Sequence, residues 1–156
     1  MTLRSGPQVG LRAADLFAAM SARDRARVQE SLASLNEVVE RPINAKIAAL
    51  LDDPAAARAE LRHALDNSAG EPEFTVFTIA TWAAYYDDSA MAIEALRGVQ
   101  NRRLIGGLIW TPLMRDVRRT PAFKGLMSEA GFVAYWRESH WNEFCQPVGD
   151  PDFACK

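Results

Sequence analysis

The sequence predicts an all-α protein, folded as a short right-handed stack of helix-turn-helix repeats that ends in an ordered irregular tail. Three observations predict this class. Apolar residues recur at helical spacing along most of the chain, one segment repeats itself further on, and the composition changes after residue 139. With 156 residues, 49% of them hydrophobic and 24% charged, the chain has the size and composition of one globular domain. We therefore expect a single domain over residues 1–156.

The N-terminal third predicts three helices. Glycine and proline make residues 1–10 a poor helix, and we expect a flexible tail there. Residues 11–20 form a short amphipathic segment. The Ser-x-x-Asp spacing of residues 21–24 is typical of a helix start, and residues 28–39 then carry one apolar stripe. Pro42 ends that helix or opens the next.

Two segments in the middle of the chain are alike. Residues 48–62 read AALLDDPAAARAELR and residues 83–97 read AAYYDDSAMAIEALR, an offset of 35 residues with eight of fifteen positions identical. We expect each Asp-Asp pair, 52–53 and 87–88, to end one helix and cap the next. A period near 34 residues is typical of tetratricopeptide-type helix pairs, in which each pair buries its apolar face against a neighbour.

A third, degenerate unit follows. Residues 104–110 are apolar, and helices are expected near residues 121–127 and 131–137. Residues 140–156 hold aromatic residues, turn residues and both cysteines, and we expect a non-helical tail that caps the stack. The end of a repeat stack exposes an apolar face, so the aromatic residues near the tail should cover it. These residues are Trp136, Trp141, Phe144 and Phe153.

The closing segment from residue 109 onward resembles the end of a bacterial family of tetratricopeptide-like regions. The matching residues are Trp110, Pro112, Arg118, Pro121, Phe123, Lys124, Gly131, Tyr135, Trp136, Arg137, Phe144, Cys145, Asp152, Phe153 and Cys155. Such regions are typically the C-terminal part of multidomain signalling proteins, behind adenylate-cyclase-type or winged-helix modules and often a membrane span. The resemblance implies a regulatory or interaction role and allows an extracytoplasmic setting. This sequence contains no cyclase, winged-helix or membrane-spanning segment, and read alone it indicates a cytoplasmic chain.

Cys145 and Cys155 are the strongest chemical candidates. The resemblance and the turn-rich loop between them favour a disulfide, which would stabilise the chain by about 2.5–3 kcal/mol. Two free thiols are the alternative. A zinc site with His140 is a third interpretation, although nine residues between the cysteines do not fit the short paired spacings of structural zinc. We expect no metal and no cofactor, and a solvent-facing His63.

Two further sets of residues could form a binding surface. Trp82, Tyr85 and Tyr86 would line a concave groove if they lay on the inner helix of a repeat, but core packing is the favoured interpretation. A basic cluster could bind phosphate or an acidic peptide, although a solvated helical face is the more ordinary interpretation. Its members are Arg102, Arg103, Arg115, Arg118 and Arg119.

No catalytic constellation is visible in the sequence. Ser139 beside His140 lacks a nucleophile elbow, and Gly106-Gly107 lacks the spacing of a phosphate loop. The net charge of −2 gives no broad attraction to nucleic acid or to membranes. We therefore expect a non-enzymatic module that binds a protein or peptide partner, or a small effector. The alternative is a structural module that self-associates, for example as a homodimer.

Overall fold

The computed structural model describes residues 6–39 and 41–156, and this part of the chain is mostly helical, which confirms the all-α class. It contains ten α-helices, one 3-10 turn and one two-stranded sheet. The elements are α1 (Gly6–Ser21), α2 (Arg25–Asn36), α3 (Pro42–Ala49), α4 (Pro54–Asp66), α5 (Glu73–Tyr85), α6 (Ser89–Arg97), α7 (Arg102–Ile109), η1 (Pro112–Met114), α8 (Arg115–Arg118), α9 (Pro121–Glu129), α10 (Phe132–Glu138), β1 (Cys145–Pro147) and β2 (Phe153–Cys155).

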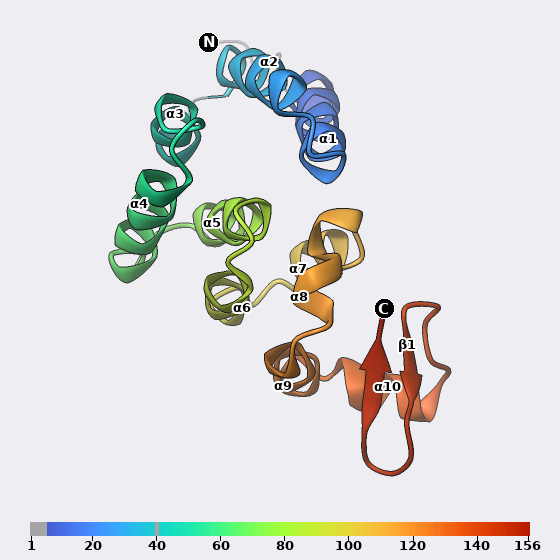
Figure 1. The fold of residues 1–156 in the computed structure, drawn as a ribbon. Coiled ribbons are helices and arrows are strands. Elements are labelled where there is room, and N and C mark those ends of the chain that lie inside the picture. The colour runs from blue at the N-terminus through green and yellow to red at the C-terminus, as the bar shows by residue number, and fades with distance from the viewer. Residues whose placement is uncertain (1–5, 40) are drawn as a thin grey trace.

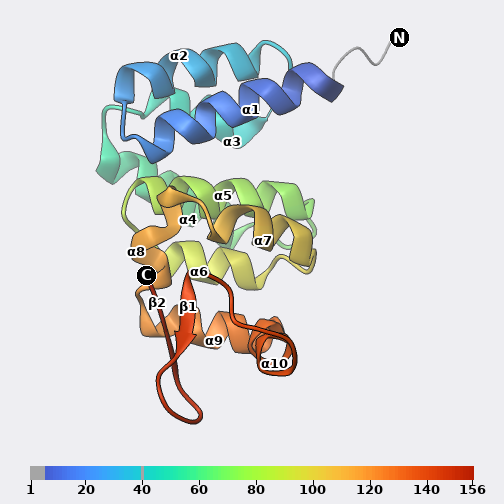
Figure 2. The same ribbon diagram turned by 90° about the vertical axis from the view of Figure 1, so that its right-hand side faces the viewer.

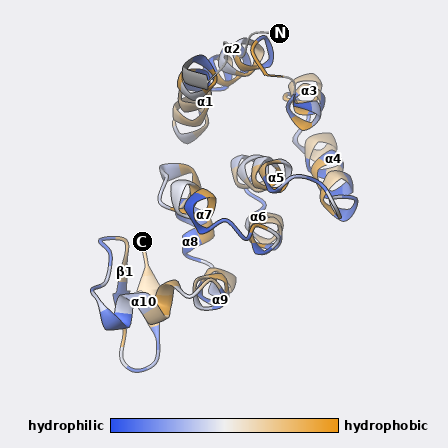
Figure 3. Ribbon diagram, turned by 180° about the vertical axis from the view of Figure 1, so that it is seen from behind, coloured by the Kyte–Doolittle hydropathy of each residue, from blue (hydrophilic) through white to orange (hydrophobic). Residues whose placement is uncertain are grey.

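The helices follow one another in layers (Figure 1). Helices α1 and α2 form the first layer, α5 and α6 lie in the middle, and α9, α10 and the hairpin lie at the opposite end (Figure 2). Figure 3 shows that the α4–α5 and α6–α7 connections are hydrophilic, whereas the helices that they join carry both hydrophilic and hydrophobic residues. None of the described helices is both long enough and apolar enough to cross a membrane.

Helix α5 is the centre of the core. All nine residues from 76 to 84 are buried, so this helix is covered on every side. The indole Nε1 of Trp82 donates a hydrogen bond of 2.9 Å to Oδ1 of Asn44, which joins α5 to α3 and satisfies both buried groups. Ala57 of α4 and Ala92 of α6 are fully buried, and their small side chains allow close helix packing, as expected from the sequence.

Both Asp-Asp pairs lie in turns between helices, as the sequence predicts. The side chain of Asp53 accepts from the amides of Ala55 and Ala56, and that of Asp88 accepts from the amide of Met91. Each second aspartate therefore satisfies backbone donors that a helix start leaves free.

The two helix pairs nevertheless pack differently. Helix α5 lies close along α6, and α1 along α2, whereas α3 and α4 are splayed apart (Figure 1). The lengths of the helices do not explain this, because α3 and α4 have eight and thirteen residues and α5 and α6 have thirteen and nine.

The start of the first helix differs from the sequence prediction. Helix α1 begins at Gly6, five residues before the expected start at Leu11, because Pro7 is tolerated in a first turn and Val9 packs against the core. Residues 1–5 of the expected flexible tail lie outside the described residues.

The C-terminal tail is non-helical, as expected, but it is not irregular. Strands β1 and β2 pair antiparallel, with Cys145 opposite Cys155 and Gln146 opposite Ala154. Asn142 opens the hairpin by accepting from the amides of Phe144 and Cys145. Such side-chain turns start a strand without any apolar periodicity, and therefore the sequence pattern did not indicate the sheet.

Candidate functional site

The two cysteines are joined by a disulfide that links β1 to β2. Their Cα atoms are 4.1 Å apart, inside the limit of about 7 Å for a bridge. Cys145 is fully buried. Within residues 6–39 and 41–156, no group of three or more His, Cys, Asp or Glu side chains is placed to hold a metal ion.

The hairpin covers an aromatic cluster at the end of the stack. Trp136 of α10 is only 5% exposed and lies 5.5 Å from Trp141 and 6.0 Å from Phe153, between ring centroids. Phe144 stacks on Trp110 with a centroid distance of 5.4 Å. The aromatic residues of the tail thus fold back over the last helices, as the sequence predicts.

Three cationic side chains hold the hairpin in place. Arg118 donates to the carbonyl oxygens of Lys156, Ile109 and Thr111. Lys124 of α9 pairs with Asp152 at 2.7 Å, and Arg137 of α10 donates to the carbonyl of Pro151. These residues carry the resemblance noted above, and in the structure they fix the end of the chain.

The structure removes Arg118 from the candidate basic cluster and leaves the other four arginines exposed, as the ordinary interpretation expects. Arg118 is 5% exposed and its guanidinium bonds to backbone carbonyls, so it is not available to a ligand. Arg102 and Arg103 open α7, whereas Arg115 and Arg119 flank α8 on the far side of η1.

The aromatic trio belongs mainly to the core. Trp82 is 1% exposed and Tyr86 is 6% exposed, and the two rings stack at 6.2 Å. Tyr85 is half-buried beside them. The core interpretation therefore holds over the groove. Burial raises the pKa of Tyr86 to about 12, and its hydroxyl has no hydrogen-bond partner in the described part of the chain.

An open groove lies instead where α3, α4 and α5 meet, and we name it the α3–α5 groove. It has a volume of about 350 Å³, within the range of ligand sites. Its apolar lining residues are Pro42, Ile43, Ala64 and Phe74, and its polar lining residues are Arg41, Lys46, His63, Asn67, Glu71, Thr75 and Thr78. Sequence reasoning missed this site. No signal in the sequence marks it, because Pro42 at the start of α3 and Phe74 in the first turn of α5 are both ordinary at those positions.

Arg41 and Phe74 form the most distinctive pair in the groove. The guanidinium of Arg41 lies over the ring of Phe74, with Cζ 4.0 Å from the ring centroid, and Phe74 is 39% exposed. Partial burial lowers the pKa of Arg41. Arg41 is also the N-cap of α3, and no side chain caps that helix start. Positive charge and helix dipole thus coincide at one end of the groove.

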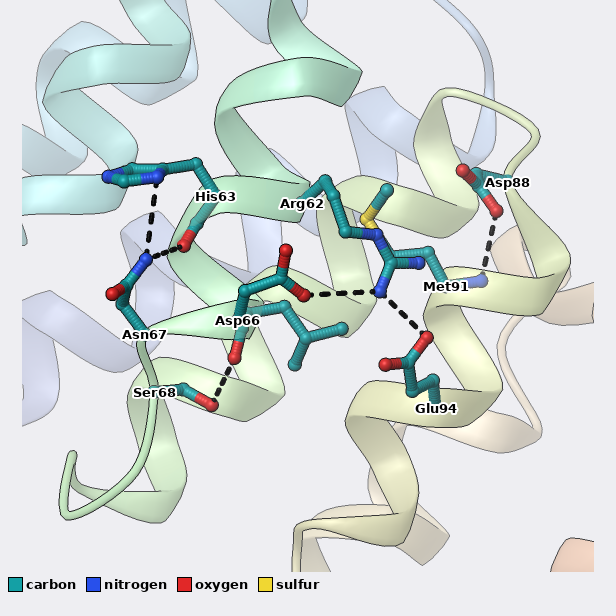
Figure 4. A network of polar contacts seen from close by, with 9 residues as sticks. Arg62, His63, Asp66, Asn67, Ser68, Asp88, Met91 and Glu94 are labelled. Atoms are coloured by element: carbon teal, nitrogen blue, oxygen red, sulfur yellow. Dashed lines mark hydrogen bonds and ion pairs between the residues drawn. The ribbon is translucent and has the colours of Figure 1, made fainter.

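The α4 wall of the groove is fixed by polar contacts (Figure 4). Asn67 donates to the carbonyl of His63 at 2.8 Å, and its amide lies 3.4 Å from Nδ1 of the His63 ring. On the other face of α4, Arg62 pairs with Asp66 of its own helix and with Glu94 of α6. His63 is exposed, as expected, but it faces this groove rather than open solvent alone.

Fold and site together define an all-helical protein with an amphipathic groove on one side and a disulfide-closed hairpin at its end. Comparison with protein-family models, curated proteins and solved structures finds no match to the chain.

Proposed function

We propose that this chain is a non-enzymatic interaction or sensory module that binds a peptide segment of a partner protein in the α3–α5 groove. The groove itself carries the proposal. It offers an apolar surface with Phe74 partly exposed, surrounded by polar groups that can orient a backbone. Its walls come from three helices that are tied to the core, so the site is pre-formed and binding costs little ordering.

The same proposal describes the fold as tetratricopeptide-like. The repeated segment and the two Asp-capped turns support it, as does the close α5–α6 pair. The resemblance of the closing segment supports a place in a bacterial multidomain signalling protein. In such a protein, a groove between helix pairs would report the presence of a partner to the neighbouring modules.

A non-enzymatic role is consistent with the surroundings of His63, the only histidine in the groove lining. Its ring neighbour is the amide of Asn67, which cannot act as a nucleophile. The threonine hydroxyl that lines the groove at Thr78 donates to the carbonyl of Phe74 and is therefore engaged in the helix.

Self-association is the alternative role. The exposed large apolar side chains of the described residues are Leu11 of α1, Phe74 of α5, Tyr135 of α10 and Val148 in the hairpin loop, and these lie from one end of the structure to the other (Figure 2). A self-complementary interface would gather them on one face. Their dispersal favours a partner of another kind.

The experiment uses random peptides displayed on phage, selected against the folded chain. A bulky side chain at Ala64, which lines the groove, should block the selected peptides, whereas the same change at the exposed Ala59 of the same helix should not. We expect Ala64→Trp to weaken binding at least tenfold and Ala59→Trp to change it less than twofold. Thermal melts check that both variants fold. Phe74→Ala, which removes an apolar contact from the groove, gives a second test. The proposal would be overturned if the selected peptides bound Ala64→Trp and Phe74→Ala as tightly as the wild-type chain. It would also be overturned if no peptide were enriched and light scattering showed a dimer.

A further inference from the structure

We infer that the occupant of the α3–α5 groove carries an acidic side chain next to a large apolar one, with Arg41 pairing with the carboxylate and Phe74 contacting the apolar group. This inference rests on the proposed function and adds the chemistry of the peptide. It follows from the charged side chains around the groove and from the ion pairs that they form within the described residues.

Among residues 6–39 and 41–156, Arg41 is the cation of the groove lining that forms no ion pair, whereas Lys46 is paired with Glu60 of α4. Burial lowers the pKa of Arg41. A half-buried guanidinium in this state is stabilised when an anion arrives.

The geometry presents this cation to a ligand. The Phe74 ring supports one face of the guanidinium and leaves its N–H edge free to meet a carboxylate in the plane. Arg41 and Phe74 also line a second, apolar cavity of about 40 Å³ behind them, which is shared with Phe17 and Leu16 of α1. Arg41 and Phe74 therefore border both the groove and this apolar cavity.

Among the described residues, Glu71 is the one carboxylate in the groove lining, and it lies in the loop before α5. It would repel a second acidic residue at that end. The acidic side chain of the ligand is therefore placed at the Arg41 end, where the uncapped start of α3 adds its positive dipole.

The probe is an array of acetylated, amidated octapeptides of Gly and Ser. Each holds one Leu, Phe or Trp and one Glu, one to three residues apart, and each has a counterpart with Gln in place of Glu. The two members differ only in charge. Affinities are measured by fluorescence anisotropy on the wild-type chain and on Arg41→Gln, Arg41→Lys and Arg103→Gln. Arg103 is an exposed arginine of α7 outside the groove lining and serves as the control.

We expect the best Glu peptides to bind at least tenfold more tightly than their Gln counterparts. Arg41→Gln should abolish that difference, Arg41→Lys should keep part of it, and Arg103→Gln should leave it intact. Equal binding of Glu and Gln peptides, or a preference that survives Arg41→Gln, would overturn the inference. If no array peptide binds while phage-selected peptides still depend on Ala64, the acidic chemistry is wrong and the proposed function stands. If array binding ignores Ala64→Trp, the groove itself is the wrong site.

Discussion

The guanidinium of Arg118 lies over the ring of Phe144, with Cζ 5.0 Å from the ring centroid, and connects helix α8 to the C-terminal hairpin. The same side chain bonds to backbone oxygens of two segments, at Ile109 and Thr111 by the end of α7 and at Lys156 after β2. Burial lowers the pKa of Arg118. A buried charge of this kind is held by its hydrogen bonds, and the segments that supply them are held together in return.

Removal of Arg118 should therefore be costly. Arg118→Ala leaves three carbonyl oxygens without their donor, and we expect the free energy of unfolding to fall by about 3 kcal/mol. Arg119→Ala, an exposed neighbour, should change it by less than about 0.5 kcal/mol. Urea denaturation measures both. Equal small effects would mean that Arg118 does not hold the hairpin.

Truncation after Ser139 tests the hairpin as a whole. It removes Phe153 and Cys145, which are 3% and 0% exposed, and uncovers Trp136. We expect a loss of about 3 kcal/mol or more at about 25 cal/mol per Å² of apolar area, together with a red shift in tryptophan fluorescence. The double variant Cys145→Ser, Cys155→Ser keeps the aromatic residues and should lose less. An unchanged melting temperature in the truncated chain would show that the hairpin does not stabilise the stack.

The ion pair between Lys124 and Asp152 should contribute to the fall of the unfolding free energy at acid pH. The hydrogen bond from Lys124 and the amide of Phe153 hold the pKa of Asp152 below its ordinary value. A lowered folded pKa stabilises the chain above the unfolded pKa of about 4, and this contribution is lost as the pH falls through the folded pKa. Asp152→Asn should flatten the acid side of the curve of unfolding free energy against pH. Asp150→Asn, in the same loop, should leave it unchanged.

Tyr86 should affect the unfolding free energy at alkaline pH. Its folded pKa of about 12 lies above the unfolded value of about 10, so its contribution is complete below pH 10 and is lost as the pH rises toward 12. Tyr86→Phe removes this loss. Because the buried hydroxyl has no partner among the described residues, the change should also stabilise the chain at neutral pH by about 1 kcal/mol. Tyr135→Phe, at an exposed position, is the control, and the same alkaline behaviour in both variants would contradict the assignment.

Local signals in the sequence predicted local structure well. The Asp-Asp pairs marked both turns, and the density of aromatic residues near Trp136 marked the covered end of the stack. Residues 6–10 were missed because the propensities of Gly6 and Gly10 were weighed without the packing of Val9, and tertiary contacts override propensity.

The α3–α5 groove could not be predicted because it depends on the angle between α3 and α4. The placement of these helices depends on contacts between distant residues, such as the bond between Asn44 and Trp82, and no local pattern reports it. The burial of Arg118 could not be predicted for the same reason, since its hydrogen-bond partners Ile109 and Lys156 are brought to it by the fold.

The hairpin is held by Arg118, Lys124 and Arg137, and all three belong to the segment that carries the resemblance. Most of the residues that carry the resemblance of the closing segment pack or pair around the hairpin, and none of them lines the α3–α5 groove. Arg41 and Phe74 could therefore change without loss of the hairpin, and a resemblance in the closing segment would not by itself imply a shared ligand.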